Sequence, residues 1–254
     1  MVKELKVRNT LLTNKRPCVC VPLIGISENE LLDEAKHIIQ KEPDLIEWRA
    51  DFFEDIGDFE KVLVALEQVR KEIGDVPLLF TIRSIQEGGQ KIELNENDKI
   101  ELIKKVCATR HIDFIDYELE NNQEYIEEVQ RNAAKNNVKL ILSFHNFHQT
   151  PNEEEMLAKL HKASNNKADI AKLAVMPNNM TDVLTVLQVT EKTNDELAIP
   201  VVTMAMGSDG AITRLAGWKT GSLFTFGIGK GSSAPGQVPI ELIKSMEAPL
   251  KSNK

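Results

Sequence analysis

The sequence predicts one closed (β/α)8 barrel, the TIM-barrel fold, with a short β-hairpin closing its N-terminal end, the bottom of the barrel. The length of 254 residues suits a single barrel. The chain also repeats one unit eight times, in which a short apolar run precedes a polar turn and an amphipathic helix pattern. No linker or low-complexity stretch separates these units. We therefore expect a single domain over residues 1–254.

The first half of the chain supplies the hairpin and four of the repeated units. Residues 2–12 precede the repeat and are predicted to form the hairpin. In the first unit, residues 18–24 predict a strand, and Ser27 with Glu30 predicts a capping box at the start of a helix. The other predicted strands are residues 44–49, 77–83 and 112–117, and the predicted helices include residues 31–39, 62–69, 100–106 and 126–129.

The second half of the chain continues the same repeat. Residues 139–145 predict the fifth strand, and Thr150, Pro151 and Glu153 predict a capping box with proline at the first helical position. The remaining predicted strands are residues 168–177, 200–206 and 223–228, and their helices include residues 183–187, 212–215 and 240–246.

An open, doubly wound parallel sheet is the alternative fold for such a repeat. Sheets of that type normally carry a glycine-rich phosphate-binding turn after the first strand. Here residues 24–29, which run from the last residue of the first predicted strand, contain a single glycine. The closed barrel is therefore favoured.

Composition and charge exclude several classes of function. A hydrophobic content of 42% and a net charge of −8 indicate a globular protein without the basic surface that binds nucleic acid or anionic membranes. No apolar run approaches the ~20 residues of a membrane helix, and the N-terminus lacks an export signal, so we expect a cytoplasmic protein. Cys18, Cys20 and Cys107 lack the spacing of a metal or redox motif and are expected to be buried, so no metal site is predicted.

Lys172 interrupts the apolar run of the sixth predicted strand. An ammonium group buried in such a strand is unfavourable unless it is paired, neutralised or used in chemistry. A buried neutral amine is a nucleophile that forms a Schiff base with a ketone. The structural alternative is a lysine that reaches water or pairs with a carboxylate.

Polar side chains gather at the C-terminal ends of the predicted strands, where the active sites of (β/α)8 barrels lie. A histidine, a lysine and three arginines at successive strand ends predict a cationic pocket for a small anionic substrate. Each candidate also has a structural interpretation. The charged residues could form ion pairs, the methionines could fill the core, and the loop could be a flexible connection. The candidates are Glu47, Arg49, Arg83, Glu87, His145, Lys172, Met204, Met206, Arg214 and the loop over residues 229–237.

Together these segments resemble the type I 3-dehydroquinate dehydratase family over essentially the whole chain. The family converts 3-dehydroquinate to 3-dehydroshikimate and water in the shikimate pathway of aromatic amino acid biosynthesis. The resemblance implies a lyase without a metal or cofactor, acting as a homodimer. It rests on residues 47–51, 80–84, 87–89, 143–147, 171–174, 206–207, 214 and 233–237.

The resemblance also implies a role for each candidate. Lys172 would form the imine, His145 would transfer protons, and Glu87 would orient His145. Arg214 would hold the substrate carboxylate. Glu47, Arg49 and Arg83 would bind ring hydroxyls; Met204, Met206 and Phe226 would form an apolar wall; Ser233 and Gln237 would close over the substrate.

Two other functions and one departure complete the expectations. A class I aldolase also uses a barrel lysine but needs a phosphate-binding loop, and a non-catalytic ligand-sensing relative would lack Lys172, His145 or Glu87. Some members of the family place a serine in the first strand, where this chain has residues 21–23, Val-Pro-Leu. We therefore expect no hydroxyl contact from that strand.

Overall fold

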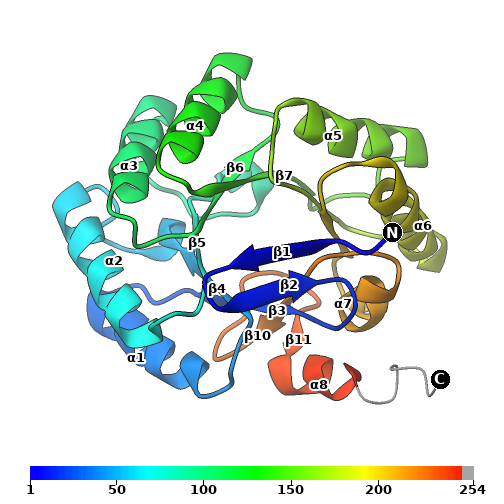
Figure 1. The fold of residues 1–254 in the computed structure, drawn as a ribbon, viewed down its shortest axis with the longest axis horizontal. Coiled ribbons are helices and arrows are strands. Elements are labelled where there is room, and N and C mark those ends of the chain that lie inside the picture. The colour runs from blue at the N-terminus through cyan, green and yellow to red at the C-terminus, as the bar shows by residue number, and fades with distance from the viewer. Residues whose placement is uncertain (248–254) are drawn as a thin grey trace.

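The structure, a computed structural model, describes residues 1–247. Within this range, eight parallel strands form a ring that helices surround (Figure 1). From β3 to β9, neighbouring strands of the ring are consecutive in the chain, as repeated βαβ units require, and β10 pairs in parallel with β3. The predicted (β/α)8 barrel is confirmed, and the end of the predicted domain, residues 248–254, lies outside the described residues. The barrel strands are β3 (Val19–Leu23), β4 (Leu45–Arg49), β5 (Leu78–Thr81), β6 (Phe114–Glu118), β7 (Lys139–Asn146), β8 (Ile170–Val175), β9 (Val201–Ala205) and β10 (Thr225–Ile228).

The ring closes between β9 and the chain just before β10. Val201 and Ser222 form a parallel bridge, and the Leu223 N–H donates to the Val201 carbonyl oxygen at 2.8 Å. A further short strand, β11 (Val238–Pro239), pairs in parallel with β10. An open doubly wound sheet leaves its outer strands unjoined, so that alternative is wrong.

The helices pack their apolar sides against the outside of the ring. The first helix begins as predicted, because the Ser27 hydroxyl accepts from the Glu30 N–H and the Glu30 carboxylate accepts from the Ser27 N–H. The helices are α1 (Glu28–Ile39), α2 (Phe59–Ile73), α3 (Glu96–Ala108), α4 (Gln123–Lys135), α5 (Glu153–Asn165), α6 (Met180–Glu196), α7 (Ala211–Ala216) and α8 (Ile240–Ser245), with short 3-10 helices η1 (Ala50–Phe52), η2 (Ile85–Glu87) and η3 (Gly217–Lys219).

The start of α5 differs from the prediction. Asn152 is the N-cap, and its side-chain oxygen accepts from the Glu155 N–H at 2.9 Å. The Thr150 hydroxyl instead donates to the carbonyl oxygen of Met176 at 3.0 Å. The capping box predicted at Thr150, with Pro151 at the first helical position, is therefore wrong, because the helix begins at Glu153 and the asparagine before it caps the Glu155 N–H.

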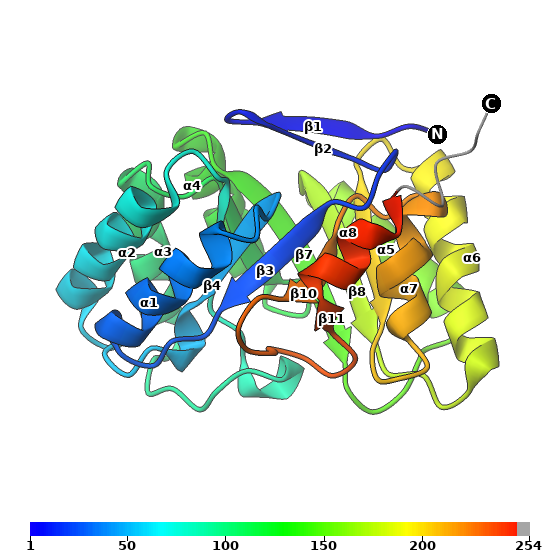
Figure 2. The same ribbon diagram turned by 90° about the horizontal axis from the view of Figure 1, so that it is seen from below.

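The N-terminal hairpin consists of β1 (Glu4–Val7) and β2 (Thr10–Thr13), which pair antiparallel. Figure 2 shows it lying across one end of the barrel, opposite the loop that joins β10 to β11. Leu12 is fully buried and joins the apolar cluster inside the ring, together with Leu79 and Phe114. The predicted hairpin at the bottom of the barrel is confirmed. None of the helices in residues 1–247 has the length and apolarity needed to cross a membrane.

Candidate active site

Every residue predicted for the site lines one cavity at the C-terminal ends of the barrel strands. The cavity encloses about 420 Å³ of space, including its opening to solvent. Phe147, Ala174 and Ala234 also line it, and these three were not predicted. The convergence follows from the barrel itself, because the inward side chains of successive parallel strands meet at one end.

Lys172 lies in the middle of β8 with its side chain inside the barrel and only 4% exposed. Its Nζ atom lies 2.8 Å from Oδ2 of Asp116 and 4.6 Å from the centroid of the Phe226 ring. The lysine is thus both buried in the cavity and paired with a carboxylate. The carboxylate partner of the structural interpretation and the buried amine of the functional interpretation are therefore present in the same residue.

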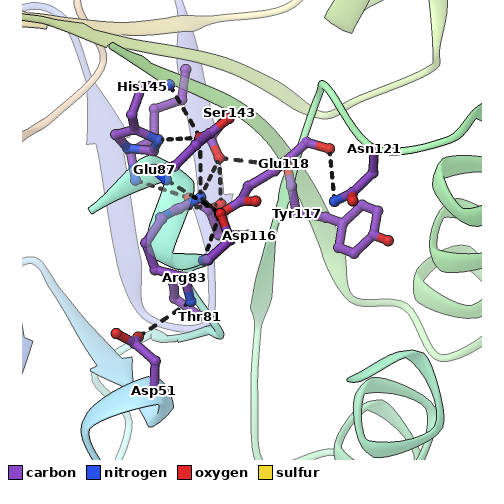
Figure 3. A network of polar contacts seen from close by, with 12 residues as sticks. Asp51, Thr81, Arg83, Glu87, Asp116, Tyr117, Glu118, Asn121, Ser143 and His145 are labelled. Atoms are coloured by element: carbon purple, nitrogen blue, oxygen red, sulfur yellow. Dashed lines mark hydrogen bonds and ion pairs between the residues drawn. The ribbon is translucent and has the colours of Figure 1, made fainter. Parts of the chain in front are cut away.

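Asp116, on β6, is at the centre of the polar network and was missed by the sequence analysis (Figure 3). Its Oδ1 accepts from Arg83 Nη2 and from the Ser143 hydroxyl, both at 2.6 Å. Burial alone would raise the pKa of Asp116, but Arg83 and Lys172 outweigh burial and hold it well below its ordinary value. The signal in the sequence was the two-residue spacing from Phe114, which places Asp116 on the inward face of its strand.

His145, on β7, forms a close pair with Glu87, which ends the 3-10 helix η2. Its Nδ1 lies 2.7 Å from Oε2 of Glu87, and that oxygen also accepts the backbone N–H of His145 at 3.1 Å. An oxygen that already accepts one N–H favours the tautomer in which Nδ1 donates as well, which leaves Nε2 for a substrate. Burial lowers the pKa of His145 well below 6.5, and the nearby Arg83 and Lys172 lower it further. The imidazole is therefore held neutral, as a general base requires.

Gly88 follows Glu87 and permits this placement. Its φ of +85° lies in the left-handed region, and a Cβ atom there would come within 2.3 Å of the Phe147 ring. Phe147 itself lines the cavity. A side chain at position 88 would therefore displace a wall of the site as well as strain the turn.

The three predicted arginines differ in how far their charges are already neutralised. Arg49 forms two hydrogen bonds of 2.8 Å to Asp51. Arg83 pairs with Asp116 and lies 3.1 Å from Glu118. These pairs leave little free positive charge at Arg49 and Arg83.

Arg214, on α7, has no carboxylate within salt-bridge distance in the described part of the chain. Its guanidinium contacts Met204 Sδ and the carbonyl oxygens of Phe226 and Pro235, at 3.4, 3.5 and 3.1 Å. Its Nε is buried without a hydrogen-bond partner, and burial lowers its pKa to about 10. Arg214 is therefore the guanidinium best placed to receive a substrate anion.

The loop over residues 229–237 covers the cavity, and hydrogen bonds within the loop and to two arginines outside it hold it there. The Gln237 side chain accepts from the Ser233 N–H at 2.9 Å and donates to the Ser233 hydroxyl at 3.1 Å. Arg49 and Arg214 each donate to a carbonyl oxygen of this loop. Among the residues that β4 and β5 contribute, the Thr81 hydroxyl donates to Glu47 at 2.9 Å, which orients that carboxylate.

The site contains acid–base and nucleophilic groups and no cluster for a metal. Among residues 1–247, no group of three or more His, Cys, Asp or Glu side chains is arranged to hold a metal ion. The site combines an interior lysine, a neutral imidazole and a guanidinium without a carboxylate partner, and this combination is typical of one class of protein. It is the class of (β/α)8-barrel enzymes that act on small anionic substrates through a lysine.

Comparison with known proteins places the chain within this class. The family model for type I 3-dehydroquinase matches residues 19–251, and the chain belongs to this family. A 3-dehydroquinate dehydratase from Geobacillus sp. (strain WCH70) is 46% identical over 244 residues, which are 96% of this chain and 94% of that protein.

Solved structures agree with the family assignment. A 3-dehydroquinate dehydratase from Geobacillus kaustophilus HTA426 superposes with a TM-score of 0.97 at 47% identity, covering 99% of this chain and 98% of that one. A type I enzyme from Clostridium difficile, solved with covalently modified comenic acid, gives a TM-score of 0.93 at 38% identity, covering 98% and 97% of the two chains.

Proposed function

We propose that this protein dehydrates 3-dehydroquinate to 3-dehydroshikimate and water through a Schiff base on Lys172. The observation that carries the proposal is the convergence of Lys172, the His145–Glu87 pair and Arg214 on one cavity. Family membership supports the same reaction over that of an aldolase or of a ligand sensor. A ketone that loses a β-hydroxyl needs an electron sink, a base and an acid, and these side chains supply all three.

The reaction begins with the amine of Lys172 attacking the ring ketone. A C–N bond forms, and the ketone oxygen leaves as water with one proton from the attacking nitrogen and the one that the Lys172 ammonium gave up to become an amine. The nitrogen keeps its last hydrogen, so a protonated imine remains. His145 Nε2 then removes a proton from the adjacent carbon, and the electron pair moves into the imine to give an enamine. The pair returns to expel the β-hydroxyl, which leaves as water with the proton from His145, and hydrolysis of the product imine restores Lys172.

The remaining residues bind and enclose the substrate in this proposal. Arg214 exchanges its contacts with carbonyl oxygens for a bidentate pair with the substrate carboxylate. Glu47, Arg49 and Arg83 bind ring hydroxyls, while Met204, Met206 and Phe226 form the apolar wall. Ser233 and Gln237 close the loop over the substrate and exclude water during elimination.

The proposal extends to the organisation of the protein. By its resemblance to the family, we propose one catalytic domain over residues 1–254, a homodimer and a cytoplasmic location. Light scattering of the purified protein tests the dimer directly, since a single species at the mass of one chain would contradict it.

Incubation with 3-dehydroquinate tests the reaction. The product is a conjugated enone, so ultraviolet absorbance should grow with time in proportion to the enzyme concentration. Borohydride added with the substrate should leave a reduced adduct on Lys172. Unchanged absorbance with correctly folded protein would refute the proposal.

A further inference from the structure

The Asp116 carboxylate is positioned against the nitrogen that would become the imine. Its side chain is fully buried, and Oδ2 lies 2.8 Å from Lys172 Nζ. Its other oxygen accepts from Arg83 and Ser143 at 2.6 Å each. The carboxylate is thus fixed by Arg83 and Ser143 on one side, while its second oxygen faces the reacting nitrogen.

Conservation of atoms and charge shows what happens at this contact when the imine forms. A lysine ammonium carries three hydrogens and one positive charge. When it combines with a ketone, two of these hydrogens leave with the ketone oxygen as water. The nitrogen keeps one hydrogen and the single positive charge, now on a planar iminium.

The single remaining N–H and its charge need a buried partner, since both are unfavourable without one. On one side of Nζ lies the Phe226 ring, whose face attracts a cation but accepts no strong hydrogen bond. Within residues 1–247, the hydrogen bond that Nζ donates is to Oδ2 of Asp116.

We propose that Asp116 is the counter-ion of the protonated imine and the residue that positions its nitrogen. This inference rests on the proposed function and names a group that the mechanism above does not use. The remaining N–H of the imine donates to Oδ2, which fixes the plane of the C=N bond relative to His145. The carboxylate also keeps the imine protonated, and only a protonated imine accepts the electron pair released by loss of the α-proton.

Other charged and titratable groups surround the contact between Asp116 and Lys172 and also affect the pH dependence of imine protonation. Asp116 remains ionised because Arg83 and Lys172 hold its pKa well below the ordinary value, against the effect of burial. The groups around the same interior are Cys20 from β3, Glu47 and Arg49 from β4, Arg83 after β5, Glu87 from η2, Glu118 from β6, His145 from β7 and Arg214 from α7.

Asp116→Asn tests the inference because it keeps the shape of the side chain and removes its charge. Wild type and variant are incubated with saturating 3-dehydroquinate across a pH series and reduced with cyanoborohydride, which reduces protonated imines. Mass spectrometry then measures the adduct on Lys172. We expect the pH at which trapping falls by half to be lower in the variant by about one unit or more, the effect of removing one adjacent opposite charge.

Asp51→Asn is the matched control. Asp51 is a fully buried aspartate at the same end of the barrel, and it pairs with Arg49 at 2.8 Å. Its loss removes one buried negative charge without touching the Lys172 contact, so trapping should keep the wild-type pH dependence. A shift as large in Asp51→Asn as in Asp116→Asn would overturn the inference, as would no shift in Asp116→Asn.

A second measurement covers the case in which Asp116→Asn does not fold. In wild-type protein labelled with 15N-lysine, the nitrogen signal of the substrate adduct reports directly whether the imine is protonated. It should remain protonated to higher pH than a ketimine of free lysine, and loss of the proton at the same pH would overturn the inference. Failure of the wild type to form any adduct would instead refute the proposed function.

Discussion

Half-buried aspartates at the N-terminal end of the barrel and the buried Asp116 beside Lys172 are both paired with cations, but they are held in different ways. At the N-terminal end, three aspartates each stand directly before a barrel strand, and each accepts the N–H near the start of the preceding strand in the ring. These pairs are Asp44 with Val19 at 2.8 Å, Asp113 with Leu78 at 2.9 Å and Asp169 with Leu140 at 2.9 Å.

Asp116, in the middle of β6 and in contact with the active-site lysine, accepts its hydrogen bonds from the side chains of Arg83, Ser143 and Lys172. A carboxylate that binds the backbone ties two strands together and therefore contributes to stability. A carboxylate that binds side chains instead fixes the position and charge of groups that can react. We therefore expect changes at one end to alter stability and changes at the other to alter catalysis.

Replacement of Lys172 by alanine should give the largest effect. It removes the amine that forms the imine, so kcat should fall by about 10⁴-fold or more. Borohydride with substrate should then leave no adduct, measured by mass spectrometry of the intact protein. Thermal unfolding serves as the control for folding, and an adduct on a different lysine would show that the role belongs elsewhere.

Replacement of Arg214 by alanine should mainly raise KM. Hydrogen bonds between charged groups contribute about 1.5–3 kcal/mol, so the loss corresponds to roughly a 10- to 150-fold increase. Arg16→Ala is the matched control at the opposite end, because Arg16 pairs with Asp44 and lies far from the cavity lining. Steady-state kinetics should show an unchanged KM for that control. Equal KM values for the two variants would contradict the role of Arg214.

Asp113→Asn tests the other side of the comparison. Asp113 pairs with Arg70 at 3.0 Å and with Arg8 of the N-terminal hairpin at 2.6 Å, in addition to the Leu78 N–H. Its loss leaves two partly buried arginines without this partner, and we expect the free energy of unfolding to fall by about 2 kcal/mol. Urea unfolding measures that change. The kcat of the variant should equal that of the wild type, and a large loss of activity at unchanged stability would reverse the assignment.

The sequence predicted the C-terminal end better than the N-terminal end. Hydrophobic periodicity predicted the barrel, and the rule that chemistry gathers at strand ends then led to Lys172, His145 and Arg214. No comparable rule directs attention to the starts of the strands. Asp44, Asp113 and Asp169 nevertheless each precede an apolar run, so the sequence does contain a repeated pattern at that end.

Asp116 was missed for a different reason. Its inward direction follows from alternation along β6, but its partners depend on the register between strands. Asp116 is opposite Ile141 on β7, and Ser143, two residues further along β7, is opposite Lys172 on β8. This register brings the side chains of Asp116 and Lys172 together inside the barrel. Register is a property of the closed ring and its stagger, which periodicity within one segment does not specify.

The smallest expected effect is the titration of His145, which depends on its enclosed position at the C-terminal end. Burial, Arg83 and Lys172 lower its pKa well below 6.5, so the imidazole should stay neutral when pH falls through 6.5. NMR titration of the ring protons of the five histidines measures this directly. One set of signals should not titrate near pH 6.5, and that set should be missing in His145→Ala.

The same shift makes a prediction for stability, and its sign follows from proton binding. The unfolded chain protonates this histidine near pH 6.5, whereas the folded protein does so only at lower pH. The unfolded state therefore binds more protons between these two values, and the free energy of unfolding should fall as pH falls through that interval. His145→Ala removes this contribution, so its stability should decline less than that of the wild type below pH 6.5. A wild-type His145 that titrates at or above 6.5, with identical pH dependence of stability in the variant, would show that the C-terminal end does not hold this imidazole neutral.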